Sequence, residues 1–185
     1  KEKDINHSNI NNNKIITFIG MMGTGKSKFG RLIAKNLNFT FYDVDLLIEN
    51  KLNNTIKNIF QENGENFFRK TEESTIKELI FNISQSNQSS VISLGGGAFD
   101  NINTRTLLLE KSHVIWLNTP IEVLVNRVGD GSKRPMIRGD VKKSISELLK
   151  KRIKYYSLSH DQLNTNKLNQ NQIIEKITKI ISNEN

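Results

Sequence analysis

The sequence has no cysteine, only two prolines and few aromatic residues, and it contains no long apolar run. The absence of cysteine excludes a disulfide framework and cysteine-based metal sites. No segment approaches the roughly 20 consecutive apolar residues that a membrane-spanning helix needs. Residues 1–13 also lack the apolar core of a signal peptide. We therefore expect a cytoplasmic protein with no membrane segment.

Length and charge further restrict the class of protein. The 185 residues are enough for one domain with a sizeable core. We expect a disordered, Asn-rich leader at residues 1–13 and a single domain at residues 14–185. The net charge is +8, from 27 Lys and Arg against 19 Asp and Glu, which suits anionic ligands. Because the lysines are scattered and aromatic residues are scarce, we expect no nucleic-acid partner.

Hydrophobic patterning predicts alternating strands and helices. Residues 15–19 form a β-branched run typical of a strand buried on both faces, residues 26–37 have one apolar helical face, and residues 39–43 read as a second strand. This order predicts a βαβ unit and a parallel sheet within a three-layer α/β/α domain. Further strands are expected at 91–94, 114–117 and 162–165. Further helices are expected at 45–52, 55–63, 65–83, 101–110, 120–128, 141–158 and 169–182, with Asp45 and Thr55 as caps and Gly64 as a stop.

The first expected strand leads into a phosphate-binding motif. Gly20-Met-Met-Gly-Thr-Gly-Lys-Ser27 matches G-x-x-x-x-G-K-[ST], with the required strand before it and helix after it. Its glycines let successive backbone N–H groups point at phosphate oxygens, and the following helix adds its positive end. Lys26 places a cation over the β- and γ-phosphates, and the Ser27 hydroxyl suits Mg²⁺. The alternative is a glycine-rich turn with a solvated lysine. The context favours a site for a nucleoside triphosphate with Mg²⁺.

An acidic pair follows at the carboxyl end of the second expected strand, where ligands bind in open α/β sheets. In an extended segment Asp43 and Asp45 point the same way, because side chains alternate. One carboxylate could serve Mg²⁺, while the other orients a substrate hydroxyl and takes its proton. The alternative is a pair of surface residues that cap a helix.

Arginines and glycines downstream suggest an anionic second ligand. Arg69 has Glu65 and Glu72 one helical turn away on either side, which fits either a salt-bridged helix surface or a guanidinium positioned to grip an anion. The triplet Gly95-Gly96-Gly97 follows a strand and leaves the backbone open to a ligand. Residues 129–139 consist largely of Gly, Asp, Ser, Lys and Arg and predict a mobile loop.

Two cations accompany that loop, and a third lies on the helix after it. Arg127 precedes the loop, and Arg134 lies within it, where it could stabilise a transferring phosphoryl group. Arg152 could face the same site, although lone arginines on helices are usually solvated.

Taken in order, these motifs resemble those of the shikimate kinases. The resemblance rests on the phosphate-binding loop, Asp43-Val-Asp45, the G-E-x-x-F-R-x-x-E element from Gly64 to Glu72, the glycine triplet, Arg134-Pro-Met-Ile137, and Arg152 before Tyr155-Tyr156. It covers roughly residues 14–182. It implies a nucleoside-monophosphate-kinase-like P-loop fold with a five-stranded parallel sheet, a substrate-binding helical region and a lid at about residues 129–139. It also implies ATP- and Mg²⁺-dependent phosphorylation of the shikimate 3-hydroxyl, in aromatic amino-acid biosynthesis.

The resemblance also implies residue roles. ATP would contact Gly23, Thr24, Gly25, Lys26, Ser27, Lys28, Arg127 and Arg134, and Ser27 and Asp43 would serve Mg²⁺. Shikimate would contact Asp45, Arg69, Gly95, Gly96, Gly97 and Arg152, with Asp45 as base or orienter. Lys26, Asp45 and Arg134 would be the catalytic residues.

The sequence departs from the family pattern after Arg152. Lys154 takes the place of a frequent Pro, and Leu158 and His160 replace an acid and a small residue, which weakens the clamp role of Arg152. Two other functions stay open: another small-metabolite P-loop kinase, such as a gluconate kinase, or a P-loop nucleotide-binding regulator without metabolite turnover. We expect a monomer.

Overall fold

The structure, a computed structural model, describes residues 13–183. Apart from Asn13, the expected disordered leader lies outside the described residues. Asn13 is held against the domain, because its side-chain amide donates hydrogen bonds to the carbonyls of Ile83 and Ser86, at 2.8 Å each.

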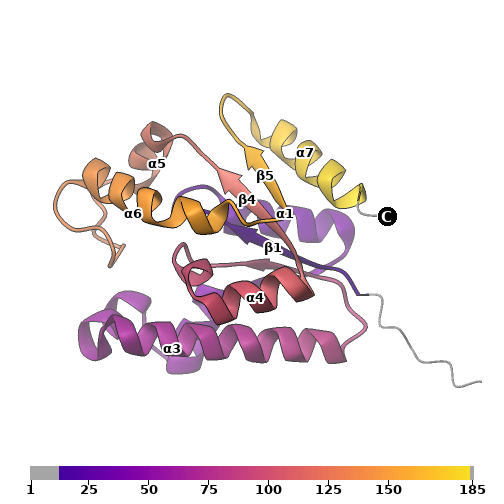
Figure 1. Cartoon of the computed structure of the whole chain (residues 1–185), viewed down its shortest axis with the longest axis horizontal. Helices are drawn as coiled ribbons and strands as arrows, with labels where there is room; N and C mark the ends of the chain where they lie inside the picture. Colours follow the sequence, from indigo (N-terminus) through magenta and orange to yellow (C-terminus); the bar gives the residue numbers. More distant parts are fainter. Residues whose placement is uncertain (1–12, 184–185) are drawn as a thin grey trace, which may run out of the picture.

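A five-stranded, all-parallel sheet forms the centre of the molecule (Figure 1). Its order is β2-β3-β1-β4-β5, so the first strand lies in the middle. The strands are β1 (Ile15–Ile19), β2 (Thr40–Asp43), β3 (Ser90–Ser93), β4 (His113–Asn118) and β5 (Asp161–Asn164). The helices are α1 (Lys26–Leu37), α2 (Val44–Leu52), α3 (Ile56–Gln85), α4 (Ile102–Lys111), α5 (Ile121–Val128), α6 (Val141–Tyr156) and α7 (Gln170–Ser182), with a 3₁₀ turn at Ala98–Asp100.

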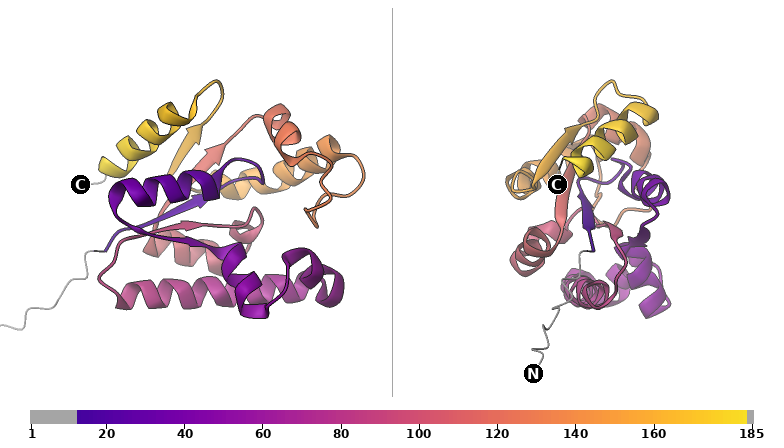
Figure 2. Two further views of the ribbon diagram at one scale, coloured as in Figure 1. Left: turned by 180° about the vertical axis from the view of Figure 1, so that it is seen from behind. Right: turned by 90° about the vertical axis from the view of Figure 1, so that its right-hand side faces the viewer.

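The two faces of the sheet have separate cores, as side-chain alternation along β1 requires. Ile15 and Ile19 pack with α2, α3, α4, α5 and α6 on one face. Ile16 and Phe18 pack with α1 and α7 on the other. Figure 2 shows α1 and α7 on the face that is hidden in Figure 1. This arrangement confirms the predicted three-layer α/β/α fold.

Most element boundaries agree with the sequence within a few residues, and Gly64 behaves as expected. Its φ of 80° and ψ of 171° interrupt α3 with a kink, where the sequence predicted two successive helices. One expectation about capping was wrong. Asp43, not Asp45, caps α2, because its carboxylate accepts hydrogen bonds from the backbone N–H groups of Asp45 and Leu46.

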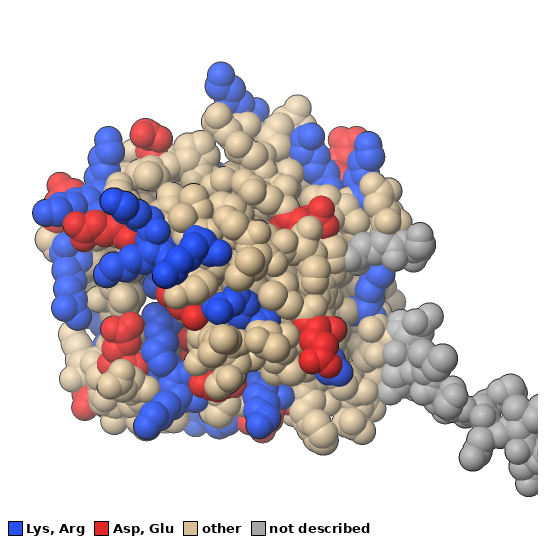
Figure 3. Space-filling view, viewed as in Figure 1, with Lys and Arg blue, Asp and Glu red and all other residues tan. Residues whose placement is uncertain are grey.

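Residues 129–140 join α5 to α6 without helix or strand and extend beyond the sheet at the left of Figure 1. Basic side chains gather on this side of the molecule, over α6 and the loop, with acidic side chains among them (Figure 3). Such a surface favours the approach of anionic ligands. Within residues 13–183, no helix combines the length and apolar character needed to cross a membrane.

Candidate active site

The loop between β1 and α1 curls around its own lysine. Gly25 caps α1 with a φ of 92°, a left-handed conformation that favours glycine. Lys26 is buried, and its ammonium donates hydrogen bonds to the carbonyls of Gly20 (2.9 Å) and Met21 (2.8 Å). Burial lowers the pKa of Lys26 to about 8, and the carboxylate of Asp45 partly opposes this effect. The loop thus presents a cation and a helix N-terminus to the same space.

Ser27 and Asp43 place two oxygen ligands side by side. The Ser27 hydroxyl donates to Asp43 Oδ2 at 2.6 Å and lies 3.2 Å from the Ser93 hydroxyl. Hydroxyl and carboxylate oxygens are the ligands that Mg²⁺ prefers. Within residues 13–183, no group of three or more His, Asp or Glu side chains could hold a metal. A Mg²⁺ ion at this place would therefore take one or two protein ligands and otherwise depend on phosphate and water, as is usual at nucleotide sites.

A cavity of about 370 Å³ opens above this loop. Its lining includes all but one of the residues predicted to bind ATP, namely Gly23, Gly25, Lys26, Ser27, Lys28, Arg127 and Arg134. Thr24 is the exception: it is buried, and its hydroxyl donates to the Met21 carbonyl at 3.0 Å. Arg127 donates to the Gly23 carbonyl at 2.9 Å, which ties α5 to the loop. We call this space the donor cavity.

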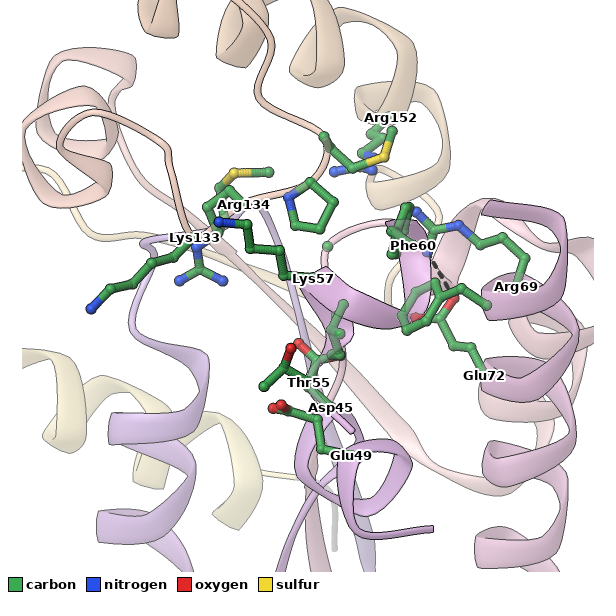
Figure 4. A pocket seen from close by; sticks show the side chains of 18 residues that line it. Asp45, Glu49, Thr55, Lys57, Phe60, Arg69, Glu72, Lys133, Arg134 and Arg152 are labelled. Atoms are coloured by element: carbon green, nitrogen blue, oxygen red, sulfur yellow. Dashed lines mark hydrogen bonds and ion pairs between the residues drawn. The ribbon is translucent and has the colours of Figure 1, made fainter. Parts of the chain in front are cut away.

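A second cavity, of about 440 Å³, adjoins the donor cavity (Figure 4). The two share Met22, Asp45, Gly95, Gly96 and Arg134. All the residues predicted to bind the second substrate border it, namely Asp45, Arg69, Gly95, Gly96, Gly97 and Arg152. We call this space the acceptor cavity. Its position beside the phosphate-binding loop suits a phosphoryl acceptor.

Asp45 lies at the junction of the two cavities. The sequence placed Asp45 beside Asp43 on the assumption that both lie in one extended segment, and this assumption was wrong. The two residues do not share an extended segment, because α2 begins at Val44. Asp45 instead occupies the first turn of α2, and both carboxylates still border the donor cavity. Burial raises the pKa of Asp45, and the neighbouring Asp43 adds to this effect. A carboxylate of raised pKa is a better proton acceptor.

Arg69 and Arg152 converge at Gly97, at the far end of the acceptor cavity. A Cβ at Gly97 would lie 2.5 Å from Arg69 Nη2 and 2.8 Å from Arg152 Nη2, so any larger residue would push the two guanidinium groups out of this arrangement. Arg69 is held by Glu72 at 2.8 Å and by Glu65 at 3.5 Å. The carboxylates flanking Arg69 thus do form ion pairs, and the guanidinium also borders the cavity.

Arg152 is not the solvated helix residue that its sequence context suggested. It is 3% exposed, and its Nε donates to Asp100 at 3.3 Å. Tyr156, one turn later on α6, donates from its hydroxyl to the Gly96 carbonyl and so holds the glycine triplet against the helix. Two arginines held by acids and aimed at one point form a clamp suited to a carboxylate.

Sequence reasoning missed several residues of the acceptor cavity. Glu72 was considered only as a partner of Arg69, yet its Oε2 is buried without a hydrogen-bond partner, and burial raises its pKa to about 7. Asp100, which does not itself line the cavity, also gave no signal, because its hydrogen bond to Arg152 joins distant segments. Most of the apolar part of the wall was also missed, namely Ile56, Phe60, Phe68, Pro135 and Met136. Helical spacing indicated Phe68 only as a core residue.

Comparison with known proteins identifies the family to which this chain belongs. A sequence model of shikimate kinases matches residues 22–182. The chain belongs to the shikimate kinase family. It is 34% identical to the shikimate kinase of Sulfurihydrogenibium sp. (strain YO3AOP1) over 90% of this chain and 98% of that protein. It is 41% identical to that of Zymomonas mobilis over 79% of this chain and 81% of that protein.

Solved structures agree with this family assignment. The shikimate kinase of Acinetobacter baumannii in complex with shikimate superimposes with a TM-score of 0.86 and 31% identity, covering 94% of this chain and 96% of that one. The shikimate kinase of Aquifex aeolicus superimposes with a TM-score of 0.76 and 30% identity, covering 91% of this chain and 97% of that one. A sugar kinase from Janibacter sp., at 15% identity and a TM-score of 0.63, shares the fold alone. The family predicted from the order of motifs is thus confirmed, and with it the class of ATP-dependent kinases.

Proposed function

We propose that this protein transfers the γ-phosphoryl group of ATP to the 3-hydroxyl of shikimate, giving shikimate 3-phosphate and ADP. The observation that carries the proposal is the pair of adjoining cavities that share Asp45 and Arg134. One cavity is built on a phosphate-binding loop, and the other ends in a clamp of two arginines. Membership of the shikimate kinase family supports the same reaction.

On the donor side, the loop amides and Lys26 would hold the phosphates. Ser27 and Asp43 would hold Mg²⁺, which supplies charge neutralisation when it is bound. Lys28 would add a further cation, Arg127 would lie along the adenine, and Arg134 would close over the phosphates. The donated group would then face Asp45 across the junction of the cavities.

On the acceptor side, the carboxylate of shikimate would bind Arg69 and Arg152, with the backbone of Gly95, Gly96 and Gly97 beside it. This places the ring hydroxyls toward Asp45. Asp45 orients the 3-hydroxyl and accepts its proton as the new O–P bond forms and the bond from the γ-phosphorus to the ADP oxygen breaks. Phosphoryl transfer depends mainly on the positioning of the two substrates and on neutralisation of the phosphate charge, which these residues supply.

We further propose that residues 129–139 act as a lid. The segment brings Arg134 and Pro135 to the rim of the acceptor cavity. Closure over both substrates would exclude water and so suppress hydrolysis of ATP. Residues 14–185 would form one domain, which we expect to act as a monomer in the cytoplasm without a nucleic-acid partner.

An acceptor panel tests the function. ADP release is measured with ATP and Mg²⁺ in the presence of shikimate, gluconate or nucleoside monophosphates, and we expect turnover with shikimate alone. Arg69→Gln should raise KM for shikimate, whereas Lys77→Gln, an exposed change on the same helix, should not. Turnover with gluconate or a monophosphate and none with shikimate would refute the proposal.

A further inference from the structure

Lys57 is a cation at the acceptor cavity that the reaction above does not use. It lies in the first turn of α3, is exposed, and borders both the acceptor cavity and a neighbouring groove. That groove, of about 430 Å³, separates the first half of α3 from residues 130–139. Within residues 13–183, no acid forms an ion pair with Lys57, although Glu65 and Asp130 border the groove and Glu49 borders the cavity.

The side chain of Lys57 extends toward Arg134 (Figure 4). Arg134 borders the donor cavity, the acceptor cavity and the groove. Its charge reaches the reacting groups, since it lowers the pKa of both Lys26 and Asp45. Lys133 also belongs to the cavity lining, but its side chain points away in the same view. Lys57 and Arg134 are therefore the two cations that face each other where residues 129–139 border the acceptor cavity.

Two cations at one boundary repel each other unless an anion lies between them. The carboxylate of the substrate does not need this place, because Arg69 and Arg152 form its clamp at the other end of the cavity. What changes during the reaction is the hydroxyl end of the acceptor, which gains a phosphate group carrying about −1.5 to −2 charges near neutral pH. A cation on this side would therefore bind the phosphorylated product more tightly than the substrate.

We propose that Lys57 is a product-binding residue, whose ammonium works with Arg134 to hold the phosphate group of the phosphorylated acceptor. The inference rests on the proposed function, because it takes shikimate 3-phosphate as the product. Lys57 would stabilise the product complex more than the substrate complex, so it would slow product release and lower KM for shikimate 3-phosphate in the reverse reaction. This part of the cavity is a subsite for phosphate and not for the carboxylate.

Equilibrium binding to the full chain tests the proposal. Dissociation constants for shikimate and for shikimate 3-phosphate are measured by calorimetry without nucleotide, for the wild type, Lys57→Gln, Lys57→Arg and the control Lys77→Gln. Lys77 is also exposed and lies on α3, but it borders neither cavity. We expect Lys57→Gln to weaken binding of shikimate 3-phosphate by roughly tenfold and binding of shikimate by less than about twofold. Lys57→Arg should keep most of the product affinity.

An equal loss for both ligands, or no loss for the phosphorylated one, would overturn the role of Lys57. An equal loss would instead indicate a lid contact with Asp130 or general attraction of anions. The proposed function is judged separately, by wild-type turnover with shikimate. Wild-type turnover together with unchanged product affinity in Lys57→Gln would reject only the inference about Lys57.

Discussion

Replacing Glu72 by Gln should remove a pH-dependent penalty on folding. Glu72 is 3% exposed; one of its carboxylate oxygens accepts a hydrogen bond from Arg69 at 2.8 Å, and the other has no partner. Burial raises the pKa of this carboxyl from 4.5 to about 7, Asp45 adds to the rise, and Arg69 and Arg152 oppose it. The amide of Gln keeps the size of the side chain but cannot ionise.

The sign and size of the effect follow from proton linkage. Between about pH 4.5 and 7, the folded state binds a proton at Glu72 that the unfolded chain has released, so the free energy of unfolding falls as the pH rises through this range. The penalty is absent below the unfolded pKa and complete above the folded one. With about 1.4 kcal/mol for each pKa unit, the loss approaches 3 kcal/mol by about pH 8.

Urea unfolding at several values between about pH 5 and 8 measures this loss. The wild type should lose stability over this range, and Glu72→Gln should lose about 2 to 3 kcal/mol less than the wild type does, because the loss has already begun at pH 5. Asp100, whose pKa burial also raises, and His113, whose pKa burial lowers, are present in both proteins, so their contributions cancel in the comparison. Glu78→Gln, at an exposed ion pair with Lys51, is the control and should keep the wild-type slope. Equal slopes for Glu72→Gln and the wild type would refute the reasoning.

Three further substitutions test the proposed reaction. Asp45→Asn should lower kcat by about 100-fold or more while the ATP dissociation constant stays the same, because Asn cannot accept the proton; full activity would remove Asp45 from the mechanism. Ser27→Ala should raise the Mg²⁺ concentration needed for half-maximal rate by about tenfold, since one oxygen ligand is lost; an unchanged Mg²⁺ titration would contradict this role. Gly97→Ala should lower kcat/KM for shikimate by up to about 100-fold at unchanged ATP affinity, because its Cβ would lie 2.5 Å from Arg69 Nη2; wild-type kinetics would show that the clamp is free to move.

Much of the donor side could be predicted because its chemistry is local. The loop from Gly20 to Ser27 uses the backbone of consecutive residues, so one short motif contains nearly all of its function. Even here, the local pattern assigned the helix cap to the wrong aspartate. Asp43 ends β2 and caps α2, since α2 begins one residue earlier than the pattern indicated, and Asp45 reaches the cavity from a helix instead of a strand.

The acceptor side depends on contacts between distant segments, which periodicity does not reveal. Arg152 on α6 meets Arg69 on α3 only because both pack against the turn after β3. From sequence, each was a charged residue on a helix, and a solvated position was the ordinary expectation. Asp100, which holds Arg152, could not be identified without the fold.

On the acceptor side, burial of charge is the property that the sequence does not reveal. A buried guanidinium is costly unless its charge is compensated, and the contact between Arg152 and Asp100 is a single one at 3.3 Å. Glu72, a buried acid nearby, is drawn toward its neutral form by its own burial. The Nη2 atoms of Arg69 and Arg152 both approach Gly97, where no side chain fills the space. An anionic ligand there would add compensation to the buried charge of Arg152, so the same burial that hid Arg152 from sequence reasoning suits the clamp to a carboxylate.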